Sequence, residues 1–193
     1  MLEDGSVYEG TARGDFKETA CEIVFNTSMT GYVEILTDPS YAGQGVVMTY
    51  PMIGNYGISR EDFESERLQP SAFIVHELSS DPSNFRCTDT IENLLKEYNI
   101  PCISGVDTRA VVKKLRESGT MRGVLTSDIG DRERLMDVIK SFRQIDLVGS
   151  VTAKQTKVYG EENTGAEIAL MDFGTKRNII NNLVKRNCIV TVY

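Results

Sequence analysis

The spacing of hydrophobic residues changes near residue 84, and this change constrains the fold more than any other feature of the chain. Before it, short runs rich in Val, Ile and Tyr are bounded by Gly, Pro, Asn or Asp, a pattern typical of β-strands. After it, apolar residues recur at helical spacing, in segments that alternate with short strand-like runs. Strands followed by alternating helices and strands predict an α/β domain with a mixed sheet and helices packed on it.

The pattern also predicts individual elements along this domain. Strands are expected at 6–9, 21–25, 32–36, 46–50, 72–78, 101–105 and 121–127, and helices at 89–98, 107–119 and 131–143. Asp89 and Glu92 have the spacing of a capping box, which would start the first helix. Asp107 or Thr108 can cap the second helix, and Gly119 can end it.

The last part of the chain, from residue 151, differs in its hydrophobic pattern from the residues before it. Residues 151–166 are polar without a sustained period and predict a linker between a first domain at 1–150 and a second unit at 167–193. In that unit a buried-type strand, an amphipathic helix and a second strand predict the opening β-α-β of an open parallel α/β domain. Two parallel strands and one helix cannot bury their own faces. We therefore expect the second domain to be incomplete, with hydrogen exchange slow up to about Leu147 and fast after Val151.

The charge of the chain excludes some classes of partner. A formal net charge of −7 over 193 residues gives no basic footprint for nucleic acid or for an anionic membrane. No apolar run approaches the roughly 20 residues of a membrane helix, and the acidic N-terminus does not resemble a signal peptide. These features predict a cytoplasmic protein that binds neither nucleic acid nor membranes.

The residue types that usually carry chemistry are sparse. Cys21, Cys87, Cys102 and Cys188 lack the spacing of a metal site, and all except Cys87 are expected to be small buried hydrophobes. The single histidine, His76, lies in an apolar strand-like stretch, which disfavours a catalytic role. No pair of carboxylates is arranged for acid–base work. The residues themselves therefore predict no catalytic group and no metal ligand.

Turn-forming residues are concentrated in the stretch LTDPSYAGQ, residues 36–44. Asp38-Pro39-Ser40 is a turn signal, and a serine in a turn usually hydrogen-bonds its own backbone. The stretch therefore predicts tight corners when it is taken alone. The alternative is that it forms one wall of a binding site.

Four segments favour the second interpretation, because together they resemble the small subunit of carbamoyl-phosphate synthase. They are residues 25–57, the tetrapeptide SNFR at 83–86, residues 107–125 and DFGTKRNIINNL at 172–183. The resemblance implies a swivelling β/β/α-type first domain and a class I glutamine amidotransferase domain that opens near Glu167. It also implies a Cys–His–Glu triad that hydrolyses glutamine, and a large subunit that uses the ammonia with ATP, magnesium and bicarbonate. The product, carbamoyl phosphate, feeds pyrimidine and arginine synthesis.

The chain departs from that family in one respect that matters for chemistry. The family nucleophile lies on a G-x-C-x-G elbow, and none of the four cysteines has this context, so the chain alone is expected to be inactive. One functional residue carries over: the serine of LTDPSY, here Ser40, is implied to contact the glutamine substrate across the domain interface. Gly43 and Gly45 are expected to let the backbone bend away from that ligand. The implied partners are the large subunit and L-glutamine, with no cofactor in this chain. The alternative is a non-catalytic interaction module that docks on the large subunit.

Overall fold

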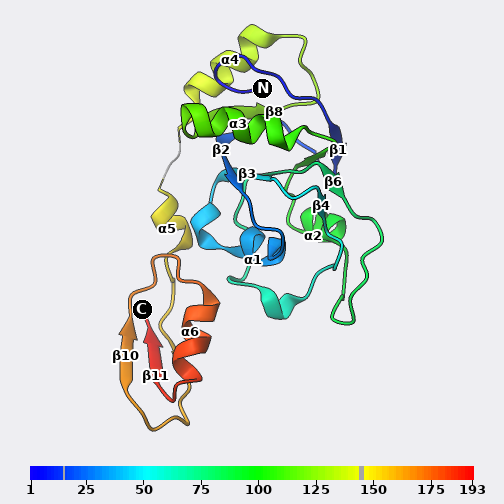
Figure 1. Cartoon of the computed structure of the whole chain (residues 1–193). Helices are drawn as coiled ribbons and strands as arrows, with labels where there is room; N and C mark the ends of the chain where they lie inside the picture. Colours follow the sequence, from blue (N-terminus) through cyan, green and yellow to red (C-terminus); the bar gives the residue numbers. More distant parts are fainter. Residues whose placement is uncertain (15, 144–145) are drawn as a thin grey trace.

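The computed structural model describes residues 1–14, 16–143 and 146–193, which form a larger α/β unit followed by a smaller one (Figure 1). A six-stranded sheet with the order β1–β7–β5–β3–β2–β8 forms the centre of the larger unit. Its strands are β1 (Thr11–Arg13), β2 (Thr19–Asn26), β3 (Gln44–Met48), β5 (Ala72–Ile74), β7 (Cys102–Ser104) and β8 (Met121–Leu125). Strands β2, β3, β5 and β7 pair in parallel, whereas β1 and β8 add antiparallel edges. The prediction of an α/β fold with a mixed sheet is confirmed.

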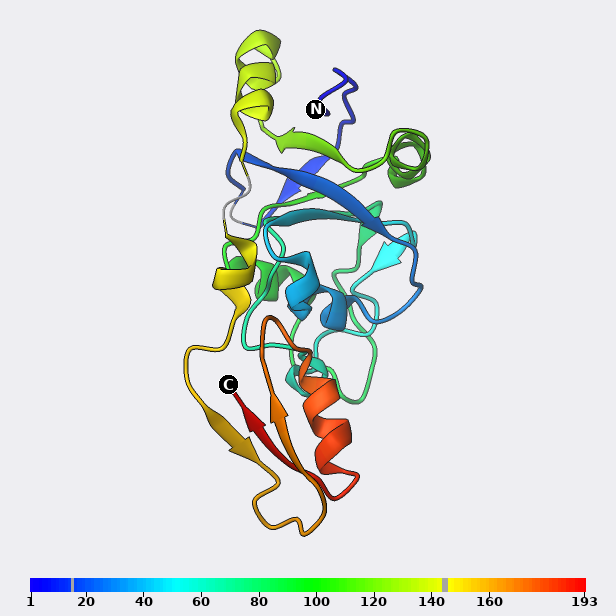
Figure 2. The same cartoon turned by 90° about the vertical axis from the view of Figure 1, so that its left-hand side faces the viewer.

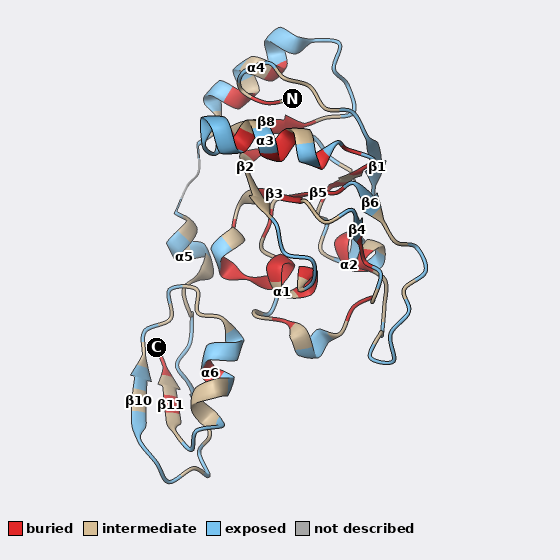
Figure 3. Cartoon of the chain, in the orientation of Figure 1, coloured by how far each residue is buried: buried red, intermediate tan, exposed pale blue. Residues whose placement is uncertain are grey.

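Helices cover both faces of this sheet. They are α1 (Tyr32–Thr37), α2 (Ile91–Glu97), α3 (Thr108–Ser118) and α4 (Arg132–Ser141). In the central strand β3, Val46 packs with α1 and α2, and its neighbour Val47 packs with α3 on the other face. Both side chains are fully buried, as the period of two in a strand requires when each face is covered. Strand β3 is buried over most of its length (Figure 3). No helix of the described residues is long and apolar enough to cross a membrane.

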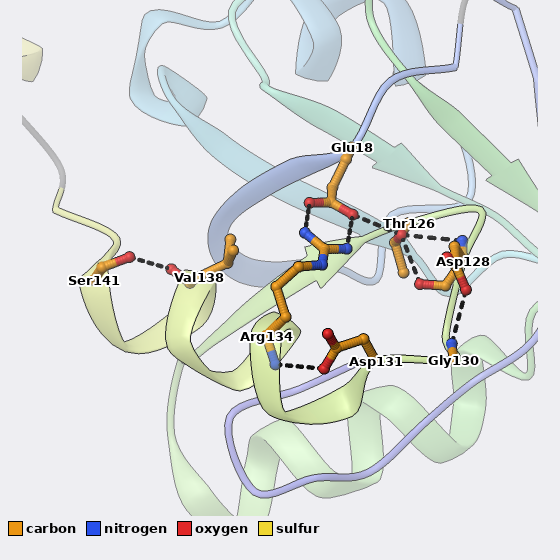
Figure 4. Close-up of polar contacts among 8 residues, drawn as sticks. All are labelled: Glu18, Thr126, Asp128, Gly130, Asp131, Arg134, Val138 and Ser141. Carbon is orange, nitrogen blue, oxygen red and sulfur yellow. Dashed lines mark hydrogen bonds and ion pairs between the residues drawn. The ribbon is translucent and has the colours of Figure 1, made fainter.

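Helix α4 lies on the opposite side of β8 from α3 (Figure 2). Leu135 and Ile139, one helical turn apart, are fully buried against Val124 of β8. The guanidinium of Arg134 adds two hydrogen bonds, of 2.7 and 2.8 Å, to the carboxylate of Glu18 just before β2 (Figure 4). The helix is therefore held both by apolar burial and by a bidentate ion pair.

The segment 32–36 was expected to be a strand, and this expectation is wrong: it forms helix α1. Its apolar residues suit either structure, since a run of five is too short for the period to decide. Two long-range features favour the helix. The parallel pairing of β2 with β3 requires a crossover connection, and α1 lies within it. The hydroxyl of Tyr56 also accepts hydrogen bonds from the N–H groups of Gly31 and Tyr32 where the helix begins.

Three smaller expectations are also corrected. Residues 6–9 form no strand, because this segment lies over the α3 face of the core, where Tyr8 packs. The strand expected at 72–78 is divided at a bend, His76, into β5 and β6 (Glu77–Leu78), and β6 pairs with β4 (Met52–Ile53). The cap of α2 is Thr90 and not Asp89.

The smaller unit contains a three-stranded sheet with the order β10–β11–β9 and one helix. Its elements are β9 (Lys157–Tyr159), β10 (Glu167–Leu170), α6 (Arg177–Val184) and β11 (Ile189–Val192), and α5 (Leu147–Val151) precedes them. The predicted parallel strand–helix–strand unit is confirmed. The polar stretch at 151–166 is nevertheless not free of regular structure, because β9 pairs antiparallel with β11. All three residues of β9 are exposed, so this strand has no alternation of buried and exposed residues by which the sequence could predict it.

The core of this unit is small. It consists of Ile180, Val190 and Val192, with partly buried neighbours. Ile179 of α6 is 49% exposed, although its neighbour Ile180 is buried. Met171 and Phe173, at the end of β10, are exposed as well. An apolar face is thus open to solvent on this unit.

Candidate functional site

Ser40 lies in a single turn of 3-10 helix, Pro39–Tyr41, directly after α1. Asp38 begins this turn, and its Oδ1 atom accepts a 2.9 Å hydrogen bond from the Ser40 N–H. The Ser40 side chain is exposed, and its hydroxyl makes no hydrogen bond to any of the described residues. The turn therefore fixes the backbone of Ser40 while its hydroxyl stays available to a ligand.

A glycine follows the C-terminal end of this turn and lets the chain change direction there. Of the two glycines expected to do so, only Gly43 has this role. Gly43 has φ of 75°, a conformation that favours glycine, and its N–H donates to the carbonyl of Gln69 at 3.1 Å. Gly45 lies in strand β3, where a Cβ atom would stand 2.6 Å from Sγ of Cys21. Its small size is therefore required by core packing and not by a bend away from a ligand, which corrects the expectation for this residue.

Asp38 joins the turn to the smaller unit. Its Oδ2 atom lies 2.7 Å from Nζ of Lys176, just before helix α6, and the Asp38 side chain is only 9% exposed. The hydrogen bond to Asp38 raises the pKa of the Lys176 ammonium, which favours the protonated form of Lys176. One carboxylate thus holds both the serine turn and the start of α6.

A second contact between the units lies beside the first. Helix α6 has no capping side chain of its own, and Glu64 of the larger unit takes that role. The Glu64 carboxylate accepts from the N–H of Asn178 at 2.9 Å, and its carbonyl accepts from the N–H of Arg177 at 2.8 Å. These bonds satisfy backbone donors that a helix start leaves free.

The two units also pack closely at this junction, where Gly174 lies beside Pro39. Gly174 has φ of 107°, and a Cβ atom there would lie 3.1 Å from Cβ of Pro39, the residue before Ser40. Pro39, Glu64 and Gly174 line a cleft of about 560 Å³ between the units. Ser40 itself is not among the described residues that line this cleft, although its chain neighbour Pro39 is. The volume of this cleft lies within the range of small-molecule sites, and its lining is more polar than the lining of most such sites.

The residues that the sequence excluded from catalysis lie away from this junction. Burial raises the pKa of both Cys21 and Cys102 to about 12, as expected for inert core thiols. Cys188, expected to be buried, is only partly so, like Cys87. The ring of His76 is exposed, and its Nδ1 lies 3.1 Å from the carbonyl of Val106.

The sequence did not single out Lys176 or Glu64 as parts of the site. Both act through contacts that span more than 100 residues of chain, and a pattern that reads neighbouring residues cannot show such contacts. The only local signal was the lack of Ser, Thr, Asp or Asn immediately before α6, which leaves its first N–H groups in need of a distant partner.

The fold and this junction define a class of protein: an α/β unit whose serine turn is tied to a smaller unit with a parallel strand–helix–strand motif. Residues 1–125 match the family model of the carbamoyl-phosphate synthase small chain, CPSase domain. The carbamoyl phosphate synthase small chain of Clostridium perfringens is 48% identical over 194 residues, which cover all of this chain and 55% of that protein. The small chain of Archaeoglobus fulgidus is 47% identical over 196 residues, covering 99% of this chain and 54% of that protein.

The chain belongs to the carbamoyl-phosphate synthase small-chain family. It spans about half the length of the curated relatives it matches. The similarity continues past residue 125, because both relatives align over nearly the entire chain, including the smaller unit.

Proposed function

We propose that this chain is the part of a glutamine-hydrolysing synthase subunit that closes the glutamine pocket. The complete subunit hydrolyses glutamine and delivers ammonia to a large subunit, which makes carbamoyl phosphate from it with ATP, magnesium and bicarbonate. This product supplies pyrimidine and arginine synthesis. The hydrolytic Cys–His–Glu triad lies outside this chain. The contribution of this chain to glutamine binding is Ser40.

The observation that carries the proposal is the position of the Ser40 turn. Its hydroxyl has no hydrogen-bond partner among the residues that the structure describes. Its backbone is held by Asp38, and the same Asp38 binds the segment that leads into α6. A neutral hydroxyl can bind an amide or a carboxylate of glutamine without burying a charge. Because the turn and α6 are tied together, the first domain can complete a pocket built mainly by the second.

The proposal is tested with the complete small subunit, alone and mixed with the large subunit. We expect glutamine hydrolysis in both cases and carbamoyl phosphate only in the mixture. The polypeptide of residues 1–193 is expected to hydrolyse no glutamine. A complete subunit without glutaminase activity that still binds the large subunit would instead support the non-catalytic interaction module.

A further inference from the structure

Phe85 is the most exposed large apolar side chain among the described residues, with 97% of its surface open to solvent. It lies in the long connection between β6 and α2, on the larger unit. Single exposed hydrophobic residues are common on protein surfaces. Phe85 differs from such residues because the loop that carries it is firmly held.

The hydrogen bonds that hold this loop lie on both sides of Phe85: before it, the Ser83 N–H donates to the carbonyl of Asn55 at 2.9 Å. The Arg86 guanidinium donates to the Asp62 carboxylate at 2.6 Å, directly beside Phe85. Farther on, the N–H of Thr88 donates to the carbonyl of Ile58 at 2.8 Å, and the Ile58 N–H donates to the carbonyl of Asp89. Since the loop is already ordered, a partner that bound Phe85 would not have to order it.

An exposed aromatic ring on an ordered loop has the properties of a binding hot spot. Such residues bury a large apolar area in a partner's pocket and dominate the binding energy. We propose that Phe85 is the anchor by which this domain docks onto another protein chain, with the ring inserted in an apolar pocket. The assignment rests on the proposed function, because the partner it names is the large subunit.

The charges around Phe85 indicate what kind of surface receives it. Arg86 pairs with both Glu61 and Asp62, so one positive charge there faces two carboxylates. Arg60, the other cation beside Phe85, is paired with Glu97, and Asp81 is exposed in the same loop. The rim is thus acidic, on a chain of net charge −7. A second copy of this chain would repel it, and so would an anionic membrane. A pocket with a basic rim on a different chain complements it.

The test uses the complete small subunit and measures its dissociation constant for the purified large subunit by calorimetry. We expect Phe85→Ala to weaken binding about 30-fold, the size of a typical hot-spot loss. Phe85→Leu retains apolar area and should weaken binding less. Ile129→Ala is the matched control, because Ile129 is an exposed apolar residue in the connection between β8 and α4, and binding should not change.

The outcomes separate this inference from the proposed function. Since the Phe85 side chain is solvent-exposed, its removal should leave the unfolding midpoint and the glutaminase activity of the free subunit unchanged. Unaltered affinity of Phe85→Ala, with normal binding by the unmodified subunit, would overturn the docking assignment alone. A failure of the unmodified subunit to bind the large subunit would overturn the proposed function and the assignment with it.

Discussion

Glu64 offers a sharp test of how the two units are joined, because its carboxylate caps helix α6 from the other unit. Glu64→Ala removes the 2.9 Å bond to the Asn178 N–H and leaves the carbonyl bond to Arg177 in place. Loss of a capping side chain costs about 1 kcal/mol, and loss of a negative charge at a helix N-terminus costs about 0.3–1 kcal/mol more. Local opening of α6 should therefore increase roughly 10- to 30-fold.

Hydrogen exchange followed by mass spectrometry measures this opening directly in the peptide that contains α6. Glu66→Ala is the matched control, because Glu66 also reaches the smaller unit but through an exposed ion pair with Lys157 at 3.1 Å. Such a pair contributes about 0–1 kcal/mol, so exchange in α6 should change little. Equal exchange in the two variants, or no increase in Glu64→Ala, would refute the capping role.

Three further predictions concern the larger unit. The hydrogen bond to Arg134 is the main cause that lowers the pKa of Glu18 from 4.5 to about 2. The pair therefore stabilises the fold above pH 4.5 and loses this effect as the pH falls towards 2. In unfolding experiments at different pH values, Arg134→Gln should reduce the loss of stability between pH 4.5 and 2. Tyr32→Phe removes a buried 2.7 Å bond to the Gly57 carbonyl and should lower the free energy of unfolding by about 1–3 kcal/mol in urea titrations, and a change below about 0.5 kcal/mol would contradict this. Leu135→Ala should cost about 2–5 kcal/mol in the same titrations, because Leu135 is fully buried, whereas a smaller loss would show that α4 closes the cavity.

The sequence predicts best where local signals agree. Helix α3 is an example: Asp107 caps it by accepting from the Ala110 N–H, and Gly119 ends it, as the sequence predicted. Its apolar residues at helical spacing, Val111, Val112 and Leu115, are buried. The predicted strands at 21–25 and 46–50 were found, with shifted ends, as β2 and β3. In these elements the residues that decide the structure are neighbours in the chain.

The errors fall where the deciding contact is distant. Residues 32–36 become helical because the crossover between β2 and β3 and the hydroxyl of Tyr56 favour that form. Strand β9 depends on pairing with β11, some 30 residues away, and its own residues carry no buried pattern. The site follows the same rule: motif resemblance indicated Ser40, but the roles of Lys176 and Glu64 required the three-dimensional structure.

The central claim is that Ser40 binds glutamine from the first domain, and the glutamine KM of Ser40→Ala in the complete enzyme tests it most directly. Loss of one neutral hydrogen bond should raise the KM about 3- to 10-fold. Carbamoyl phosphate synthesis from added ammonia should not change, and neither should the KM of Ser80→Ala, a control at another exposed serine. A KM for Ser40→Ala equal to that of the unmodified enzyme would contradict the account.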